Sequence, residues 1–129
     1  CIQDEQIKAC AASGGVMGIT GLSIFHGPAS DPIVGLVNHI DYVVQLVGPE
    51  HVGLGLDYVY DMPALQSLAR LHSDKWPKGG GYTNPEICQV GPANLPQVTE
   101  ALLNRGYSEE DIRSILGGNF FRVFQAVCG

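Results

Sequence analysis

The sequence is poor in basic residues, and this shortage narrows the classes of function. Seven Lys and Arg stand against thirteen Asp and Glu in 129 residues, which gives a formal net charge of −6. The basic residues are scattered, so no basic face is expected. No nucleic-acid partner is predicted, because neutralising phosphates requires clustered Lys and Arg.

Long apolar runs are also missing. No run approaches the roughly 20 residues that a helix needs to cross a bilayer, and no charged segment followed by an apolar one indicates a signal peptide. No membrane segment is therefore expected within this chain. The chain begins with Cys1 rather than Met and leads directly into a helical pattern. We expect that residue 1 is not the natural start, which leaves the localisation unknown, cytoplasmic or periplasmic if the protein is bacterial.

The spacings typical of metal ligands are absent. None of the four cysteines forms a C-x-x-C pair, and a disulfide framework is not expected at this density in a chain of this size. The histidines show neither H-x-H nor H-x-x-x-H spacing. The cysteines and histidines are Cys1, Cys10, Cys88, Cys128, His26, His39, His51 and His72. No metal ligand is assigned within the chain, and the cysteines are predicted to be free thiols.

What the sequence does contain is an alternation of helical and strand patterns. Asp31 and Pro32 are typical of a helix start, and apolar residues then recur at three- and four-residue steps. Short apolar runs bounded by glycine indicate buried strands. Ser108 with Asp111 indicates a last helix, with Gly117-Gly118 as a weak point inside it. The elements before it are predicted as helix 4–12, strand 16–20, loop 21–31, helix 32–47, strand 51–58, helix 62–72, loop 73–96 and helix 96–105.

Strands that alternate with helices predict parallel β-α-β units and an α/β fold class. An isolated pair of strands is only marginally stable and exposes its edges. Residues 1–129 are therefore predicted to form a single segment of a larger α/β sheet. Residues 73–96 hold three consecutive glycines and four of the eight prolines, which is typical of a long loop with a functional role.

A carboxylate interrupts the second predicted strand, in the run HVGLGLDYVYD at residues 51–61. Because side chains alternate along a strand, three aliphatic residues share one face, and Gly53, Gly55 and Asp57 share the other. Two glycines followed by an acid suit an interior crowded by a ligand or by other strands. Catalytic groups of (β/α)8 barrels lie at the carboxyl ends of strands, as Asp57 does. The alternative, that Asp57 only caps the following turn, stays open.

Several stretches together resemble the membrane dipeptidase family, the renal-dipeptidase-like metallopeptidases. Their sequences are most similar to those of bacterial members. They follow one another in the same order as in the family and cover almost the whole chain. The matching stretches are DEQIKACAASGGVMGI, NHIDYVVQLVG, VGLGLDY, NLPQVTEALLNRGYSEEDI and GGNFFRVF.

The resemblance implies a (β/α)8 TIM-type barrel of the metal-dependent hydrolase type, with two zinc ions, that hydrolyses dipeptides. Asp57 matches the family's aspartate after the last barrel strand, so a catalytic role as proton acceptor is implied for it. The family's metal ligands, and the arginine that holds the substrate carboxylate, lie upstream of the matching segment. Many members continue Asp-Phe-Asp-Gly where this chain reads Asp57-Tyr58-Val59-Tyr60-Asp61, so this edge of the pocket departs from the family pattern.

The sequence does not assign the substrate contacts, and His26 and Tyr58 are the candidates. His26 lies in the loop after the first strand, on the side where a barrel's active site opens. His39 and Asp41 flank the apolar stripe of their helix and are expected to be solvated or to support other groups. His51 begins its strand at the opposite end, which indicates a structural role.

The loop 73–96 offers a further candidate surface. Trp76, Pro77 and Tyr82 can supply an apolar wall, so a lid or an oligomer contact is predicted there. Gly79-Gly80-Gly81 lacks the Lys-Ser/Thr pair that follows a phosphate-binding loop, which favours a flexible loop.

Residues 1–129 are therefore interpreted as the C-terminal strands and helices of a dipeptidase barrel, incomplete and inactive alone. The expected partners are a dipeptide substrate and either a second copy or the rest of the barrel. The alternative is a non-catalytic α/β module that binds a partner through its open sheet edge.

Overall fold

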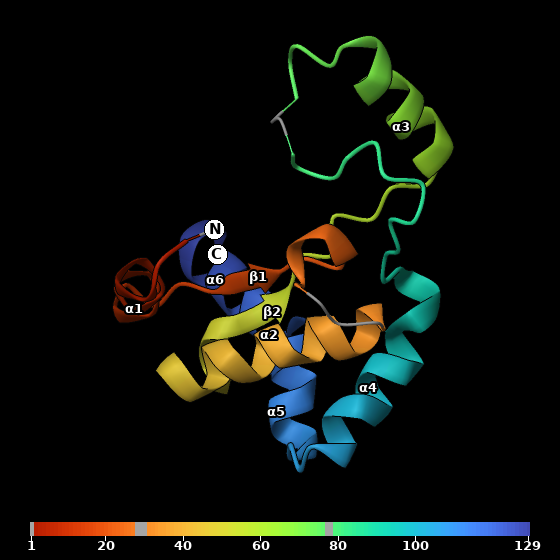
Figure 1. Cartoon of the computed structure of the whole chain (residues 1–129). Helices are drawn as coiled ribbons and strands as arrows, with labels where there is room; N and C mark the ends of the chain where they lie inside the picture. Colours follow the sequence, from red (N-terminus) through yellow and green to blue (C-terminus); the bar gives the residue numbers. More distant parts are fainter. Residues whose placement is uncertain (1, 28–30, 77–78) are drawn as a thin grey trace.

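A parallel pair of short strands forms the centre of the fold. The computed structural model describes residues 2–27, 31–76 and 79–129, so Cys1 and Pro77 lie outside the described residues. Strand β1, Met17–Ile19, pairs with β2, Val52–Leu54, in the register Met17↔Val52, Gly18↔Gly53 and Ile19↔Leu54. The chain passes from β1 to β2 through helix α2 (Figure 1). The predicted parallel β-α-β unit is confirmed.

The second strand is shorter than the sequence pattern predicted. The alternating pattern predicts an extended range 51–58, whereas His51 ends a 3-10 turn, Pro49–His51, and regular pairing stops at Leu54. Two further main-chain hydrogen bonds join the segments that follow the strands. Gly55 N–H donates to the Ile19 carbonyl, and Gly21 N–H donates to the Leu56 carbonyl, both at 2.9 Å. The extended path ends at Asp57, whose φ is 53°.

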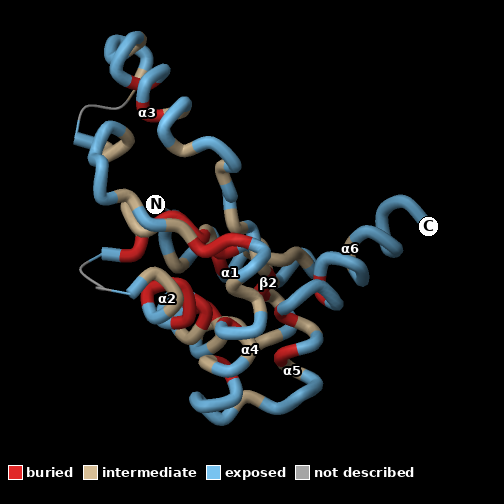
Figure 2. Tube along the Cα trace, turned by 90° about the vertical axis from the view of Figure 1, so that its right-hand side faces the viewer, coloured by how far each residue is buried: buried red, intermediate tan, exposed pale blue. Residues whose placement is uncertain are grey.

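Helix α2, Pro32–Val47, packs against the strand pair. Its start is fixed by Asp31, whose side chain accepts hydrogen bonds from Ile33 N–H at 2.7 Å and Val34 N–H at 3.4 Å. Gly48, with φ of 98°, ends the helix because a left-handed backbone favours glycine. The apolar stripe is buried as predicted, and its fully covered members are Leu36, Val37 and Ile40. Figure 2 shows buried residues concentrated on α2 and beside it.

The other helices surround this unit, apart from α3. They are α1 Asp4–Ala12, α3 Met62–Leu71, α4 Leu95–Asn104, α5 Glu109–Arg113 and α6 Asn119–Cys128. Helices α1, α4 and α5 contribute Ile7, Val98, Leu102 and Ile112 to the core. Helix α3 lies apart from the strands, on an excursion of the chain (Figure 1). No helix in the part of the chain that the structure describes is both long and apolar enough to cross a membrane.

The last predicted helix is divided in two. A π-helical turn, Ser114–Gly118, separates α5 from α6, and its helical backbone breaks at Gly117, the predicted weak point. The apolar face is buried at Ile112 and Ile115 but not beyond the break, where Phe124 is 63% and Val127 is 77% exposed. The predicted apolar face is therefore covered only over its first half.

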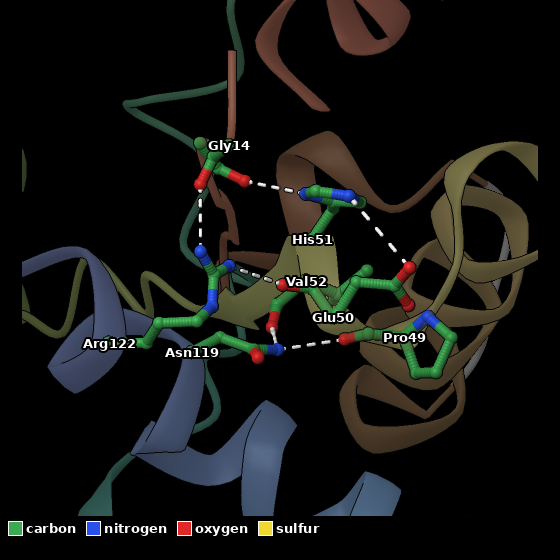
Figure 3. A network of polar contacts seen from close by, with 8 residues as sticks. Gly14, Pro49, Glu50, His51, Val52, Asn119 and Arg122 are labelled. Carbon is green, nitrogen blue, oxygen red and sulfur yellow. Dashed lines mark hydrogen bonds and ion pairs between the residues drawn. The ribbon is translucent and has the colours of Figure 1, made fainter. Parts of the chain in front are cut away.

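The first turns of α6 hold the amino ends of both strands. The Asn119 side chain is buried and donates to the Pro49 carbonyl at 2.8 Å and the Val52 carbonyl at 2.7 Å. Arg122 donates to the Gly14 carbonyl at 3.0 Å and the Glu50 carbonyl at 2.8 Å (Figure 3). These bonds join α6 to the segment before β1 and to the segment before β2.

His51 adds a direct link between the same two segments. Its Nδ1 lies 2.9 Å from the Gly15 carbonyl, which fits the structural role that the sequence indicated at this end of the strand.

His26 fills a buried position between the end of β1 and α2. Its Nε2 donates to the Thr20 carbonyl at 2.8 Å, so in the neutral ring Nδ1 carries no proton; Nδ1 is buried without a hydrogen-bond partner among the described residues. A Cβ on Gly35 would lie only 2.6 Å from the His26 Cβ, so the ring needs glycine beneath it. Burial lowers the pKa of His26, the Thr20 bond raises it less, and nearby His39 lowers it further.

We predict that replacing Asn119 with Ala lowers the free energy of unfolding by about 2–4 kcal/mol, because two main-chain carbonyls lose their donor. Urea denaturation measures the change. Asn104→Ala, at the exposed end of α4, is the matched control and should change stability by less than about 0.5 kcal/mol. Equal effects of the two substitutions would show that the Asn119 bonds add nothing to the fold.

We also predict that stability falls as the pH is lowered through about 6.5, the ordinary pKa of histidine. The unfolded chain takes up a proton at His26 before the folded chain does, so the contribution of the neutral ring is fully present above this pH and declines below it. Urea denaturation at about pH 5.5 and pH 7.5 measures the slope. His26→Gln should reduce the slope, and an unchanged slope would contradict the prediction.

Candidate active site at the carboxyl ends of the strands

Three segments that are distant in sequence meet at the carboxyl ends of the strands. They follow β1, follow β2, and return from the α3 excursion at residues 88–90. Gly21 joins all three, since its N–H donates to the Leu56 carbonyl and its carbonyl accepts from Val90 N–H, both at 2.9 Å. Leu22 and Gln89 form an antiparallel bridge beside it.

Glycine is required at position 21 because the main chains of two other segments approach it closely. A Cβ there would lie 2.8 Å from the Val90 carbonyl oxygen and 3.0 Å from the Leu56 carbonyl oxygen. Such distances leave no room for a side chain, because both neighbours are main-chain atoms. The sequence pattern does not predict this role, since its only local signal is a glycine directly after an apolar strand.

Asp57 lies one residue beyond this junction, three residues after β2 ends at Leu54. Its side chain is exposed, and its φ of 53° is in the left-handed region that Asp and Asn visit more readily than most residues. Unusual backbone of this kind is concentrated at functional sites. The cap of the following helix α3 is Asp61, which accepts a hydrogen bond from Ala64 N–H at 2.9 Å. Helix α3 is therefore capped by Asp61 and not by Asp57.

Tyr58 extends from the same strand end as Asp57. It is 46% exposed, and its ring lies against Gly91, where an added Cβ would come within 2.6 Å of the Tyr58 Cε2 atom. The returning segment therefore supports the aromatic ring that follows Asp57.

His26 lines a different part of the molecule from Asp57. A cavity of about 630 Å³ runs along Met17–Thr20 between α1 and α2, and both His26 and His39 line it, whereas Asp57 and Tyr58 do not. The two imidazole centroids are 5.7 Å apart. The structure thus brings His26 and His39 together and does not join either of them to Asp57.

His39 and Asp41 lie on different sides of α2, and their surroundings fit the solvated or supporting roles expected from the sequence. His39 is exposed, and Asp41 forms an ion pair with Arg105 and accepts a hydrogen bond from the Tyr107 hydroxyl at 2.7 Å. Asp41 therefore links α2 to the segment after α4.

The described residues do not by themselves fit a metal ion. Nowhere in ranges 2–27, 31–76 and 79–129 do three or more His, Cys, Asp or Glu side chains gather as a metal site. A zinc pair near Asp57 would need ligands from elsewhere.

The α3 excursion is held together mainly by its own contacts. Gln66 donates to the Asn84 carbonyl at 2.8 Å, and the rings of Trp76 and Tyr82 are 4.9 Å apart. Tyr82 also meets Phe25, after β1, at 6.3 Å between ring centroids. The predicted loop 73–96 ends earlier than expected, because α4 begins at Leu95 after a 3-10 turn, Pro92–Asn94.

Comparison with known proteins agrees with the resemblance seen in the sequence. The family model described as Membrane dipeptidase (Peptidase family M19) matches residues 1–72 and 79–128. A Klebsiella pneumoniae protein named "Uncharacterized protein in pqqA 5'region" is 27% identical over 132 residues, which cover 98% of this chain and 40% of that protein.

Two mammalian relatives carry the name Dipeptidase 3. The protein from Mus musculus is 24% identical and that from Rattus norvegicus is 22% identical; each alignment covers 98% of this chain and 22% of the relative. The chain thus spans well under half the length of these relatives. No solved structure matches the chain. With the family model covering nearly all of its residues, the chain belongs to the membrane dipeptidase family, Peptidase family M19.

Proposed function

We propose that this chain supplies the last two strands of a zinc-dependent dipeptidase barrel, with Asp57 as its catalytic group. The observation that carries the proposal is the position of Asp57, exposed on the segment that follows the carboxyl end of the parallel strand β2. This is where (β/α)8 barrels place their catalytic groups. Membership of the dipeptidase family supports the same reaction.

The proposed role of Asp57 is that of a general base. Hydrolysis of a dipeptide requires a water molecule to attack the amide carbonyl, and the water must lose a proton as it does so. An exposed carboxylate at the strand end can accept that proton and return it to the leaving amine. The zinc ions would supply Lewis-acid chemistry, with ligands from outside these 129 residues.

The exposed apolar surfaces support the proposal that the barrel is completed by further strands. The sheet of the described residues holds only β1 and β2, and a parallel pair alone is marginal. Phe121, Phe124 and Val127 on α6 are each more than half exposed. A larger barrel would cover such surfaces, so the 129-residue chain alone is proposed to be inactive.

Tyr58 is the better supported of the two proposed substrate contacts. Its ring is partly exposed and follows Asp57 directly. His26 is buried in a separate cavity with its Nε2 already bonded to the Thr20 carbonyl, so a direct contact with a substrate at Asp57 is not supported.

The open edge of β1 favours a second candidate function. The cavity along Met17–Thr20 can receive a strand from another protein, because unpaired edges add strands readily. In this case the chain is a non-catalytic α/β module, and Asp57 has no chemical role.

We predict that Asp57→Asn in the full-length protein lowers kcat for dipeptide hydrolysis by at least about 100-fold, because general-base catalysis is lost. The melting temperature should hardly change, since Asn tolerates the same backbone conformation. Steady-state kinetics and thermal unfolding measure the two effects. Asp61→Asn is the matched control and should keep its activity, because Asn caps a helix as well as Asp. A fully active Asp57→Asn protein would show that Asp57 is not the general base and only forms part of the turn.

We also predict that purified residues 1–129 neither hydrolyse dipeptides nor retain zinc, whereas the full-length protein retains about two zinc ions and is active. Zinc content by mass spectrometry and dipeptide hydrolysis are measured on both. Activity of the 129-residue chain equal to that of the full-length protein would overturn the barrel proposal. A full-length protein without activity or zinc would favour the partner-binding module.

A further inference from the structure

The side chain of Gln89 bonds to both main-chain groups of Val59. Val59 N–H donates to Gln89 Oε1 at 2.9 Å, and Gln89 Nε2 donates to the Val59 carbonyl at 2.8 Å. A glutamine amide offers a donor and an acceptor side by side, so it pairs with a main-chain residue much as a neighbouring strand would. The segment after β2 is thereby fixed although it lies outside the sheet.

Gln89 is itself held firmly. Its backbone forms the antiparallel bridge with Leu22. The residues on either side are bonded as well, Cys88 through its carbonyl to Ser23 N–H at 2.9 Å and Val90 through its N–H to the Gly21 carbonyl at 2.9 Å. The amide group therefore projects from a part of the chain that is anchored to the end of β1.

Asp57 lies between two fixed points. On one side, the Leu56 carbonyl accepts from Gly21 N–H; on the other, Val59 is held by Gln89. Only two residues separate these points, and Asp57 has its left-handed φ of 53° between them. Sparsely populated backbone conformations persist where the surroundings determine them in this way.

We propose that Gln89 is a positioning residue for Asp57, which holds the carboxylate at the strand end by fixing the main chain of Val59. This inference rests on the proposed catalytic function of Asp57. Both polar atoms of the Gln89 side chain are bonded to the main chain of Val59, so its proposed effect on Asp57 passes through the backbone. Small displacements of a catalytic group lower the rate of the chemical step more than they weaken binding.

The substitution that tests this inference is Gln89→Met in the full-length protein, because Met keeps the length of the side chain and removes both hydrogen bonds. We expect kcat for a dipeptide to fall by about 10- to 100-fold, with KM changed by less than about twofold. Gln89→Glu keeps an acceptor for Val59 N–H but loses the donor, so its kcat should lie between those of the wild type and Gln89→Met. Gln66→Met is the matched control, since Gln66 also donates to a main-chain carbonyl, that of Asn84, within the α3 excursion.

Hydrogen exchange gives a second readout that does not depend on activity. Val59 N–H should exchange faster in Gln89→Met than in the wild type and should be unchanged in Gln66→Met. If the wild type hydrolyses dipeptides but Gln89→Met keeps its kcat within about twofold, the inference is overturned while the proposed function stands. If the full-length wild type hydrolyses no dipeptide, the proposed function fails. Gln89 then cannot position a catalytic carboxylate, and exchange at Val59 reports only on the hydrogen bonds.

Discussion

The hydrogen bonds from α6 to the amino ends of the strands are the constraint on which this fold depends. Two short parallel strands have no hairpin to join them and would be marginal by themselves. Asn119 places both protons of its amide on carbonyls before and within β2, and Arg122 spans from Gly14 to Glu50. Because these carbonyls are more than 65 residues away in sequence, the last helix fixes the two strands as a unit.

This arrangement gives the two ends of the sheet different properties. At the amino ends, polar side chains of α6 donate hydrogen bonds to main-chain carbonyls. At the carboxyl ends, the main chain of three segments meets around Gly21, and Asp57 is left exposed. A catalytic group needs a rigid support and an open side at once. The junction at Gly21 supplies the support, and the hydrogen bonds of α6 at the opposite end leave the side chain of Asp57 exposed.

Local patterns in the sequence predicted most of the elements, but not the contacts that place the site. The helix over 32–47, the parallel strands and the break at Gly117 follow from capping residues, apolar periodicity and glycine. The range of β2 did not, because alternation alone cannot show that Asp57 leaves the extended conformation. The bonds made by Asn119 and Gln89 join side chains to distant main-chain atoms, and no periodicity encodes such pairs.

The glycine face of the sheet shows how the end at Asp57 stays open. The sequence predicted that Gly53 and Gly55 face a crowded interior, and the structure fills the first position with the ring of Phe120: a Cβ on Gly53 would lie 2.5 Å from Phe120, and one on Gly18 would lie 3.4 Å from it. At Gly55 the nearest atoms belong only to the Gly18 backbone. Phe120 therefore closes this face at the amino end and stops short of the carboxyl end. Because Asn119 anchors the same turn of α6, the interaction that holds the strands together also places Phe120 against Gly53 and leaves the glycine face uncovered by this ring at Gly55.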